Sequence, residues 1–291
     1  MSTFTLPEPY PPYKVTLPHD VTEDHLLNFP AFKNWITTLQ HSLDLQKHKD
    51  HVFHASPYKL RGINVQSAVW FGKRLGFVKI QATIEDDEKN WLPGAVFLRG
   101  GSVGMLMILQ PDDVPKGTEI DKYVILTVQP RIAAASFAFT EIPAGMLDGE
   151  TFTGAAAKEI EEETALVVPQ DELEDMTSLA LTGTSTSPFT TEKDRGEDFK
   201  EKLQNAMYPS PGACDEFIPL FLWQKRVPRS FLDGLRGRCT GLRNEGERIT
   251  LKVVKLEDLW REGARDAKAL AALALYEGLR KVPGKLKPIH N

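Results

Sequence analysis

The acidic run KEIEEE at residues 158–163 constrains this chain more than any other stretch, because it lies in a segment that we expect to be helical. At about 100° per residue, Glu159, Glu162 and Glu163 share one face of the helix, and Glu161 falls on the opposite side. Carboxylates stacked three and four residues apart repel each other by roughly 0.2–0.5 kcal/mol per pair. A positive partner is therefore expected beside this face.

The acidic face offers only hard oxygen ligands, since the run contains no His or Cys. This donor chemistry suits Mg²⁺ or Mn²⁺ better than zinc. Taken alone, an acidic run is more often a solvated helix face. The preceding segment favours a site, because Gly145 and Gly149 flank a tight loop, which is followed by Glu150 and by a helix start rich in small residues. Loop and helix then bring their acids to one place.

The composition limits the partners and the compartment that we expect. A net charge of −5 without a basic block argues against nucleic acid as a partner. The two cysteines, Cys214 and Cys239, indicate a reducing compartment in which both thiols are free. The sequence shows no apolar run long enough to span a membrane and no secretory signal, so we expect a cytoplasmic protein with no membrane partner.

The stretch EIPAGMLDGETFTGAAAKEIEEETAL at residues 141–166 resembles the Nudix box, whose pattern is G-x5-E-x7-R-E-U-x-E-E-x-G-U with U an aliphatic residue. All carboxylates of the pattern are present, at Glu150, Glu159, Glu162 and Glu163. The preceding EIPAG is similar to the ELPAG that precedes the box in the ADP-sugar pyrophosphatase branch of the Nudix hydrolases. The resemblance is most specific at the carboxylates.

Three departures from the box pattern concern its other positions. Gly145 is followed by four residues rather than five before Glu150, Lys158 stands in place of Arg, and Ala165 stands in place of Gly. Lys is a point charge where Arg is a planar fork. The family Gly lies where the helix ends, so we expect Ala165 to carry backbone strain. These changes bear on the turnover rate more than on the metal site.

The resemblance implies a metal site for Mg²⁺ (or Mn²⁺) formed by the side chains of Glu159, Glu162 and Glu163 and the backbone carbonyl of Ala144. It also implies that Glu141 supports the substrate beside this site. Glu162, as a box carboxylate, is in addition a candidate for the group that activates water.

Three further segments resemble substrate-binding parts of the same branch. Arg131 closes a Gln-Pro-Arg segment where the family has Gln-x-Arg, and its guanidinium is implied to contact the diphosphate. The segment YPSPGACDE at 208–216 is similar to SPG-x-x-x-E, so Pro211 and Gly212 would form a stiff wall of the nucleotide pocket. Trp70 is a candidate for an aromatic group near the nucleotide. Surface, turn and core roles remain the respective alternatives.

The segment EGERI at 245–249 resembles the mobile E-x-E-D-I loop of bacterial ADP-ribose pyrophosphatases, with Arg248 in place of Asp. A carboxylate on a hinged loop reaches the attacking water only after substrate has bound. The resemblance implies Glu245 as the general base and Glu247 as its support. Two solvated acids are the alternative.

The expected fold class is α/β, and the resemblance implies a Nudix α/β/α sandwich with a mixed sheet for residues 96–291. Residues 1–95 are expected to form a segment and a small antiparallel β-sheet domain that makes a homodimer. The patterns predict several individual elements. These are a helix over 29–45, strands over 58–86 around the turn FGKRLGF, strands over 176–181 and 250–254, and a helix that Asp266 caps or begins and that ends at about Arg280.

The function implied by the resemblance is Mg-dependent hydrolysis of the diphosphate of ADP-sugars, such as ADP-glucose and ADP-ribose, to AMP and sugar phosphate. Two alternatives stay open. One is a Nudix hydrolase of another diphosphate, such as UDP-glucose, a coenzyme or an isoprenoid diphosphate. The other is a catalytically weak protein that binds nucleotide sugars.

Overall fold

The computed structural model describes residues 1–147, 152–182, 200–242 and 248–289. The chain folds into two compact units. The first comprises Met1–Gly101, Gly183–Gln204 and Ser210–Phe217, and the second comprises Ser102–Thr182, Asn205–Pro209 and Ile218–Asn291. Among the described residues, no helix is both long and apolar enough to cross a membrane.

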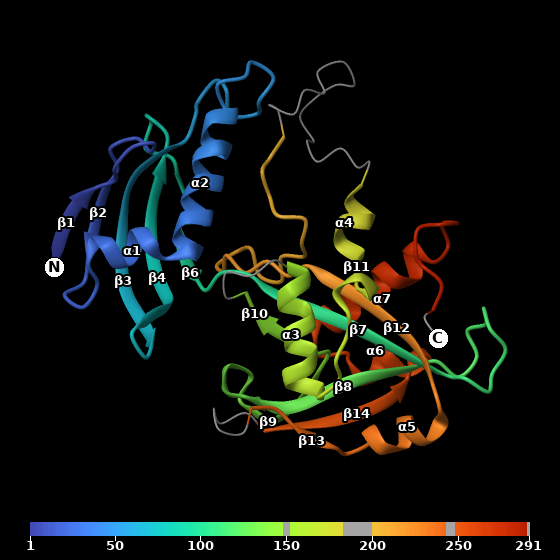
Figure 1. Cartoon of the computed structure of the whole chain (residues 1–291). Coiled ribbons are helices and arrows are strands. Elements are labelled where there is room, and N and C mark those ends of the chain that lie inside the picture. The colour runs from blue at the N-terminus through green and yellow to red at the C-terminus, as the bar shows by residue number, and fades with distance from the viewer. Residues whose placement is uncertain (148–151, 183–199, 243–247, 290–291) are drawn as a thin grey trace. The chain divides into compact units, whose positions relative to one another are not determined.

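The first unit is a six-stranded sheet with two helices packed against it (Figure 1). The strand order is β1-β2-β3-β4-β5 with β6 beside β4, and every pairing is antiparallel except that of β2 with β3. Side chains from both helices and from the sheet share one buried cluster. The elements are β1 (Ser2–Thr5), β2 (Lys14–Leu17), α1 (Glu23–Asn28), α2 (Pro30–Leu45), β3 (Lys59–Phe71), β4 (Arg74–Glu85), β5 (Trp91–Leu92) and β6 (Ala95–Leu98).

Local sequence signals explain two of these elements. Pro30 occupies the first position of α2, where its missing N–H would have no helical partner and its fixed φ suits the helix. Gly72, with φ of 61°, makes the tight turn between β3 and β4, a conformation that favours glycine. The predicted helix over 29–45 and the predicted hairpin around FGKRLGF are both confirmed.

The second unit has an eight-stranded mixed sheet, with strand order β11-β12-β7-β8-β14-β13 and with β10 beside β7 and β9 beside β8. Only β12 and β7 are parallel. The strands are β7 (Ser102–Pro111), β8 (Tyr123–Arg131), β9 (Ser136–Glu141), β10 (Ala144–Met146), β11 (Glu174–Asp175), β12 (Leu220–Val227), β13 (Cys239–Thr240) and β14 (Ile249–Lys255). The helices are α3 (Phe152–Thr164), α4 (Met176–Leu181), α5 (Arg229–Leu235), α6 (Leu259–Glu262) and α7 (Ala267–Leu279).

Two buried clusters show that helices cover both faces of this sheet. One cluster joins the sheet to side chains of α3 and α5, and the other joins it to α4, α6 and α7. Figure 1 shows α3 and α7 in layers on opposite sides of the strands. Every residue of β7 is buried, which is typical of a central strand that is covered on both faces. The α/β/α sandwich with a mixed sheet is therefore confirmed.

Strands β7 and β8 separate at one end of the sheet. They pair only at Ile108 with Val124 and at Leu109 with Tyr123. Beyond that point β7 pairs with β10 and β8 pairs with β9. The short connection from β9 to β10 therefore lies between the separated strands, and α3 packs against β7 and β10 there.

The strand predicted over 176–181 is wrong, because this segment forms the helix α4. Asp175 caps its start by accepting a hydrogen bond from the backbone N–H of Ser178 at 3.0 Å, and its other carboxylate oxygen accepts from the Ser178 hydroxyl at 2.7 Å. A segment of only six residues does not distinguish helix from strand by its periodicity. The capping carboxylate decides the outcome here.

Candidate active site

Helix α3 presents its acids as the helical wheel predicts. Glu163 is buried, Glu159 and Glu162 are half-buried, and Glu161 is exposed. The face that carries Glu159 and Glu163 lies against β10 and β7, at the end of the sheet where β7 and β8 separate.

Glu163 is held in place by neutral donors. Its Oε1 accepts from the Gln129 side-chain amide at 3.0 Å, and its Oε2 accepts from the backbone N–H of Ala144 at 3.0 Å. Burial raises the pKa of the Glu163 carboxyl to about 8, and the charges of Glu141 and Glu159 add to the rise while both hydrogen bonds oppose it. The carboxylate is thus well oriented but poorly compensated in charge.

Gly145 allows the Glu159 carboxylate to lie directly against the backbone of β10. A Cβ built on Gly145 would fall 1.6 Å from Cδ of Glu159 and about as close to both of its oxygens. No side chain fits there unless Glu159 moves. Glycine is therefore needed at the start of the box for lack of space, whatever its backbone dihedral angles are.

Glu141, at the end of β9, is buried between two cations. Its Oε1 accepts from Nε of Arg131 at 2.6 Å, and its Oε2 accepts from Nζ of Lys268 at 3.0 Å. Lys268 also donates to Oδ1 of Asp266 at 2.9 Å, and Oδ2 of Asp266 accepts from the backbone N–H of Ile142 at 3.0 Å. The start of α7 is therefore linked to the connection between β9 and β10.

Arg131 ends β8 with a half-exposed side chain. Burial lowers its pKa, but the charges of Glu141, Glu163 and Asp266 outweigh burial and raise the pKa above the ordinary value. Because one carboxylate fixes Nε, the rest of the planar guanidinium is oriented in advance. Such a group suits an anion at the mouth of the site.

The donor chemistry of this place fits a hard divalent cation. Glu159 and Glu163 bring carboxylate oxygens close to the backbone of Ala144 and Gly145, and the buried Glu163 has only neutral hydrogen-bond donors. In the described part of the chain, no group of three or more His, Cys, Asp and Glu side chains is gathered closely enough to hold a metal ion. The third predicted ligand, Glu162, has its Oε1 4.0 Å from Nζ of Lys158.

The other predicted site residues belong to the first unit or lie outside the described residues. Trp70 lies in β3 of the first unit, where its ring meets the His25 ring edge-on at 4.8 Å between centroids. Pro211 and Gly212 belong to the segment that clusters with the first unit. The predicted bases Glu245 and Glu247 lie outside the described residues. Their roles stay predictions.

Sequence reasoning missed three residues of the site. Gln129 was visible in the Gln-Pro-Arg segment, but nothing there indicated a bond to Glu163. Lys268 follows the expected cap Asp266 and is an ordinary helix residue by sequence. Thr240 donates from its hydroxyl to the backbone carbonyl of Glu163 and holds the end of α3, although β13 is 77 residues away in sequence. Only Gln129 carried a usable signal.

The sequence of the chain is similar to those of known proteins. The NUDIX domain family matches residues 102–273, more than half of the chain. Nudix hydrolase 14, chloroplastic, from Arabidopsis thaliana is 32% identical over 249 residues, which cover 84% of this chain and 69% of that protein. A crystal structure of an ADP compounds hydrolase is 14% identical, with a TM-score of 0.46, and the match covers 79% of this chain and 97% of that one.

Nudix hydrolases generally use divalent metal ions, in agreement with the oxygen donors on α3. The domain match spans the strands β7 to β14 and most of α7, so it contains every part of the site described above. The chain therefore belongs to the Nudix family and is an enzyme that hydrolyses a diphosphate linkage.

Proposed function

We propose that the enzyme hydrolyses the diphosphate of ADP-sugars, such as ADP-glucose and ADP-ribose, to AMP and sugar phosphate with Mg²⁺. One observation carries the proposal: the separated ends of β7 and β8 bring the carboxylates of α3 and the Arg131–Glu141 pair to one place. Carboxylates that hold a metal ion, next to an arginine that can contact phosphate oxygens, suit a phosphoanhydride substrate.

Arg131 is the group that would bind the diphosphate. Glu141 holds its Nε, and Lys268 holds Glu141 in turn, so the guanidinium is oriented before substrate arrives. Its remaining N–H groups can donate to phosphate oxygens and offset the charge that grows on them during cleavage.

Glu159, Glu162 and Glu163, with the carbonyl of Ala144, would hold Mg²⁺. When bound, the ion neutralises diphosphate charge and lowers the pKa of a coordinated water. The close approach at Gly145 fixes Glu159, and the bonds from Gln129 and Ala144 fix Glu163, so two of the proposed ligands are oriented in advance.

Hydrolysis forms one P–O bond, breaks another and transfers one proton from the attacking water. The water oxygen bonds to one phosphorus, the bridging P–O bond breaks, and the leaving phosphate takes the electron pair. Glu245, supported by Glu247, is the proposed acceptor of the water proton, and Glu162 is the box carboxylate that would otherwise accept it. One product is AMP and the other is the sugar phosphate.

The preference for ADP-sugars over other diphosphates rests on motifs outside the acids. EIPAG at 141–145 and the SPG turn at 210–212 are similar to those of the ADP-sugar branch. Pro211, Gly212 and Trp70 are the proposed wall of the nucleotide site. A homodimer formed through the first unit and a cytoplasmic location remain part of this proposal, and the name of the Arabidopsis relative says that it is chloroplastic.

Purified enzyme incubated with Mg²⁺ and each of ADP-glucose, ADP-ribose and UDP-glucose tests the proposal, with release of AMP or UMP as the readout. We expect AMP from both ADP-sugars, with kcat/KM at least about tenfold above that for UDP-glucose. Glu163→Gln should lower turnover on the order of 100-fold or more, whereas Glu161→Gln, on the exposed face of the same helix, should not change it.

Two results would contradict different parts of the proposal. Faster release of UMP than of AMP would reject the ADP preference and keep the diphosphate hydrolase. Tight binding of ADP-glucose with no product under any divalent ion would reject turnover of this substrate.

A further inference from the structure

A cavity of about 470 Å³ lies in the second unit, at the end of the sheet opposite the active site. It is lined by the loop between β7 and β8, by the end of β12, by the end of α7 and by the segment that follows α7. Lys122, which lines it, precedes β8, whereas Arg131 ends β8. At ~3.3 Å per residue the strand separates them by roughly 25–30 Å, so this cavity is not part of the active site.

The charge of this cavity has the opposite sign to that of the chain. The lining contains five cationic side chains and one carboxylate, whereas the whole chain has a net charge of −5. The cationic residues are Lys116, Lys122, Arg226, Arg280 and Lys287. The local field therefore attracts anions although the enzyme as a whole repels them.

The single carboxylate in the lining, Glu119, is already paired with neighbouring side chains. Its Oε1 accepts from Nζ of Lys122 at 2.7 Å, its Oε2 accepts from the hydroxyl of Tyr276 at 3.1 Å, and Nη1 of Arg280 lies 3.9 Å from the same oxygen. Glu119 thus partly offsets Lys122, and Arg280 is also paired with Glu277, whose Oε2 accepts from Nε of Arg280 at 2.8 Å. Lys116, Arg226 and Lys287 have no ion-pair partner among the residues that the structure describes.

Arg226 is the most informative of these cations because it is buried, with 7% of its surface exposed. Its Nη1 donates to the Gln110 side-chain oxygen at 3.1 Å, and its Nη2 donates to the carbonyls of Asp112 and Val114 at 3.0 and 2.6 Å. All three acceptors are neutral. The charge of Asp113 acts on Arg226, but Asp113 forms no ion pair with it. Because no carboxylate of the described residues contacts the buried guanidinium, an anion in the cavity would stabilise it further.

The remaining wall is apolar and comes from the segment after α7, including Val282, Leu286 and Ile289. The segment is held in place, since the backbone N–H of Lys287 donates to Oε2 of Glu174 at 2.9 Å and Nζ of Lys287 donates to the carbonyl of Asp171 at 2.9 Å. The cavity volume lies in the range of sites for small molecules.

We propose that this cavity is a second binding site that takes a small polyanionic metabolite, carrying phosphate groups or several carboxylates, with its uncharged part against the apolar wall. The site is separate from catalysis and does not depend on the proposed substrate. Arg226 provides the fixed buried charge, and Lys116 and Lys287 provide exposed charges at the rim.

Isothermal titration calorimetry on the metal-free full chain tests the proposal, with inorganic pyrophosphate and citrate as separate probes. We expect at least one probe to bind at one site per chain, more weakly as salt is raised. The double variant Lys116→Glu/Lys287→Glu should weaken that binding at least tenfold. Pyrophosphate binding alone identifies a phosphate-bearing ligand, and citrate binding alone identifies a polycarboxylate.

Two control variants test whether the anion binds in this cavity. Lys33→Glu/Lys49→Glu makes the same change in net charge on exposed residues of the first unit and should leave affinity within twofold. Arg131→Gln changes the active site and should also leave it unchanged. If the charge-reversal variant fails to fold, as judged by its circular dichroism, Lys116→Gln takes its place.

The proposal is overturned if neither probe binds, if the two double variants lose affinity equally, or if Arg131→Gln abolishes the binding. The second result would indicate a general charge effect, and the third would place the anion in the active site.

Discussion

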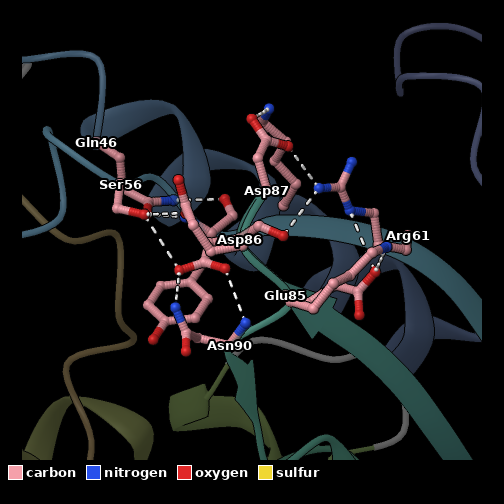
Figure 2. A network of polar contacts seen from close by, with 11 residues as sticks. Gln46, Ser56, Arg61, Glu85, Asp86, Asp87 and Asn90 are labelled. Carbon is pink, nitrogen blue, oxygen red and sulfur yellow. Dashed lines mark hydrogen bonds and ion pairs between the residues drawn. The ribbon is translucent and has the colours of Figure 1, made fainter.

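Two buried carboxylates, one in each unit, have opposite electrostatic settings. Asp86, at the end of β4 in the first unit, is 3% exposed and accepts from the backbone N–H of Asn90 at 2.8 Å, its side-chain amide at 2.7 Å and the Ser56 hydroxyl at 3.1 Å (Figure 2). Hydrogen bonding, first from the Asn90 side chain, lowers the pKa of Asp86 below its ordinary value. Glu163 is 4% exposed, yet burial raises its pKa to about 8.

The surroundings of the two groups explain the difference. Around Asp86 the donors of Asn90, four residues away, and of Ser56, 30 residues away, enclose the carboxylate. Next to it Arg61 donates to Asp87 at 2.7 Å. Glu163 receives only two neutral donors and lies near the charges of Glu141 and Glu159. The first network closes a turn with its hydrogen bonds satisfied. The second network leaves negative charge on Glu163 that a bound cation would compensate.

The largest effect is expected when a cation is removed from the active-site network. Lys268→Met leaves Glu141 and Asp266, which are 3% exposed each, without their shared partner. We expect the free energy of unfolding in urea to fall by about 3–5 kcal/mol. The matched control is Lys252→Met, which breaks the half-exposed pair with Glu262 at 2.6 Å and should lower the free energy of unfolding far less. Equal losses of unfolding free energy in the two variants would show that burial does not strengthen the effect of removing the cation.

The next effect concerns the steric fit between Gly145 and Glu159 in the active site. Gly145→Ala places a Cβ where the Glu159 carboxylate lies, so that carboxylate must move by an ångström or more. We expect kcat to fall on the order of 100-fold, as measured by AMP release. Gly278→Ala, where an added Cβ meets nothing within 4 Å, should leave kcat unchanged. Unchanged activity in Gly145→Ala would show that the position of Glu159 is not needed.

An intermediate effect compares the two carboxylates directly by replacing each with its amide. In metal-free protein at neutral pH, Asp86→Asn should lower the free energy of unfolding, and Glu163→Gln should not. Because the pKa of Asp86 is lowered in the folded state, its stabilisation is present above its unfolded pKa of about 3.9 and disappears as pH falls through the folded value. The deficit of Asp86→Asn should therefore shrink on acidification. A larger loss of unfolding free energy in Glu163→Gln than in Asp86→Asn would contradict this contrast between the two carboxylates.

The smallest effect separates backbone strain from charge on the helix that carries Glu163. Ala165 ends α3 with φ of 57°, in the left-handed region that costs a residue with a Cβ about 1 kcal/mol. Ala165→Gly should raise the free energy of unfolding by about that amount. Ala274→Gly, on the exposed side of α7, should instead lower it by about 0.5–1 kcal/mol. A rise in the free energy of unfolding in both variants would contradict the backbone strain at Ala165.

Elements with local causes could be predicted from the sequence. The 3.6-residue period placed Glu159 and Glu163 on one face and Glu161 on the other, and Ala165 in place of the family Gly predicted the strained helix end, which the structure confirms. The cap at Asp266 was also predicted, and its carboxylate accepts from the Lys268 N–H. Helix α4 could not be predicted from periodicity, since its six residues are too few, and the capping residue Asp175 gave a signal that the strand prediction did not use.

The contacts that make the site depend on distant parts of the chain. Lys268 reaches Glu141 across 127 residues, and Gln129 reaches Glu163 across 34. The cationic cavity joins residues from 116 to 289 that no motif connects.

By itself the sequence determined which side chains exist, which helix face they occupy and which family they belong to, because these follow from local periodicity and from a short motif. Only the tertiary structure decided which carboxylate is buried, which is enclosed by donors, and where positive charge collects. Burial and electrostatic interaction depend on distance in space, and the fold alone sets that distance.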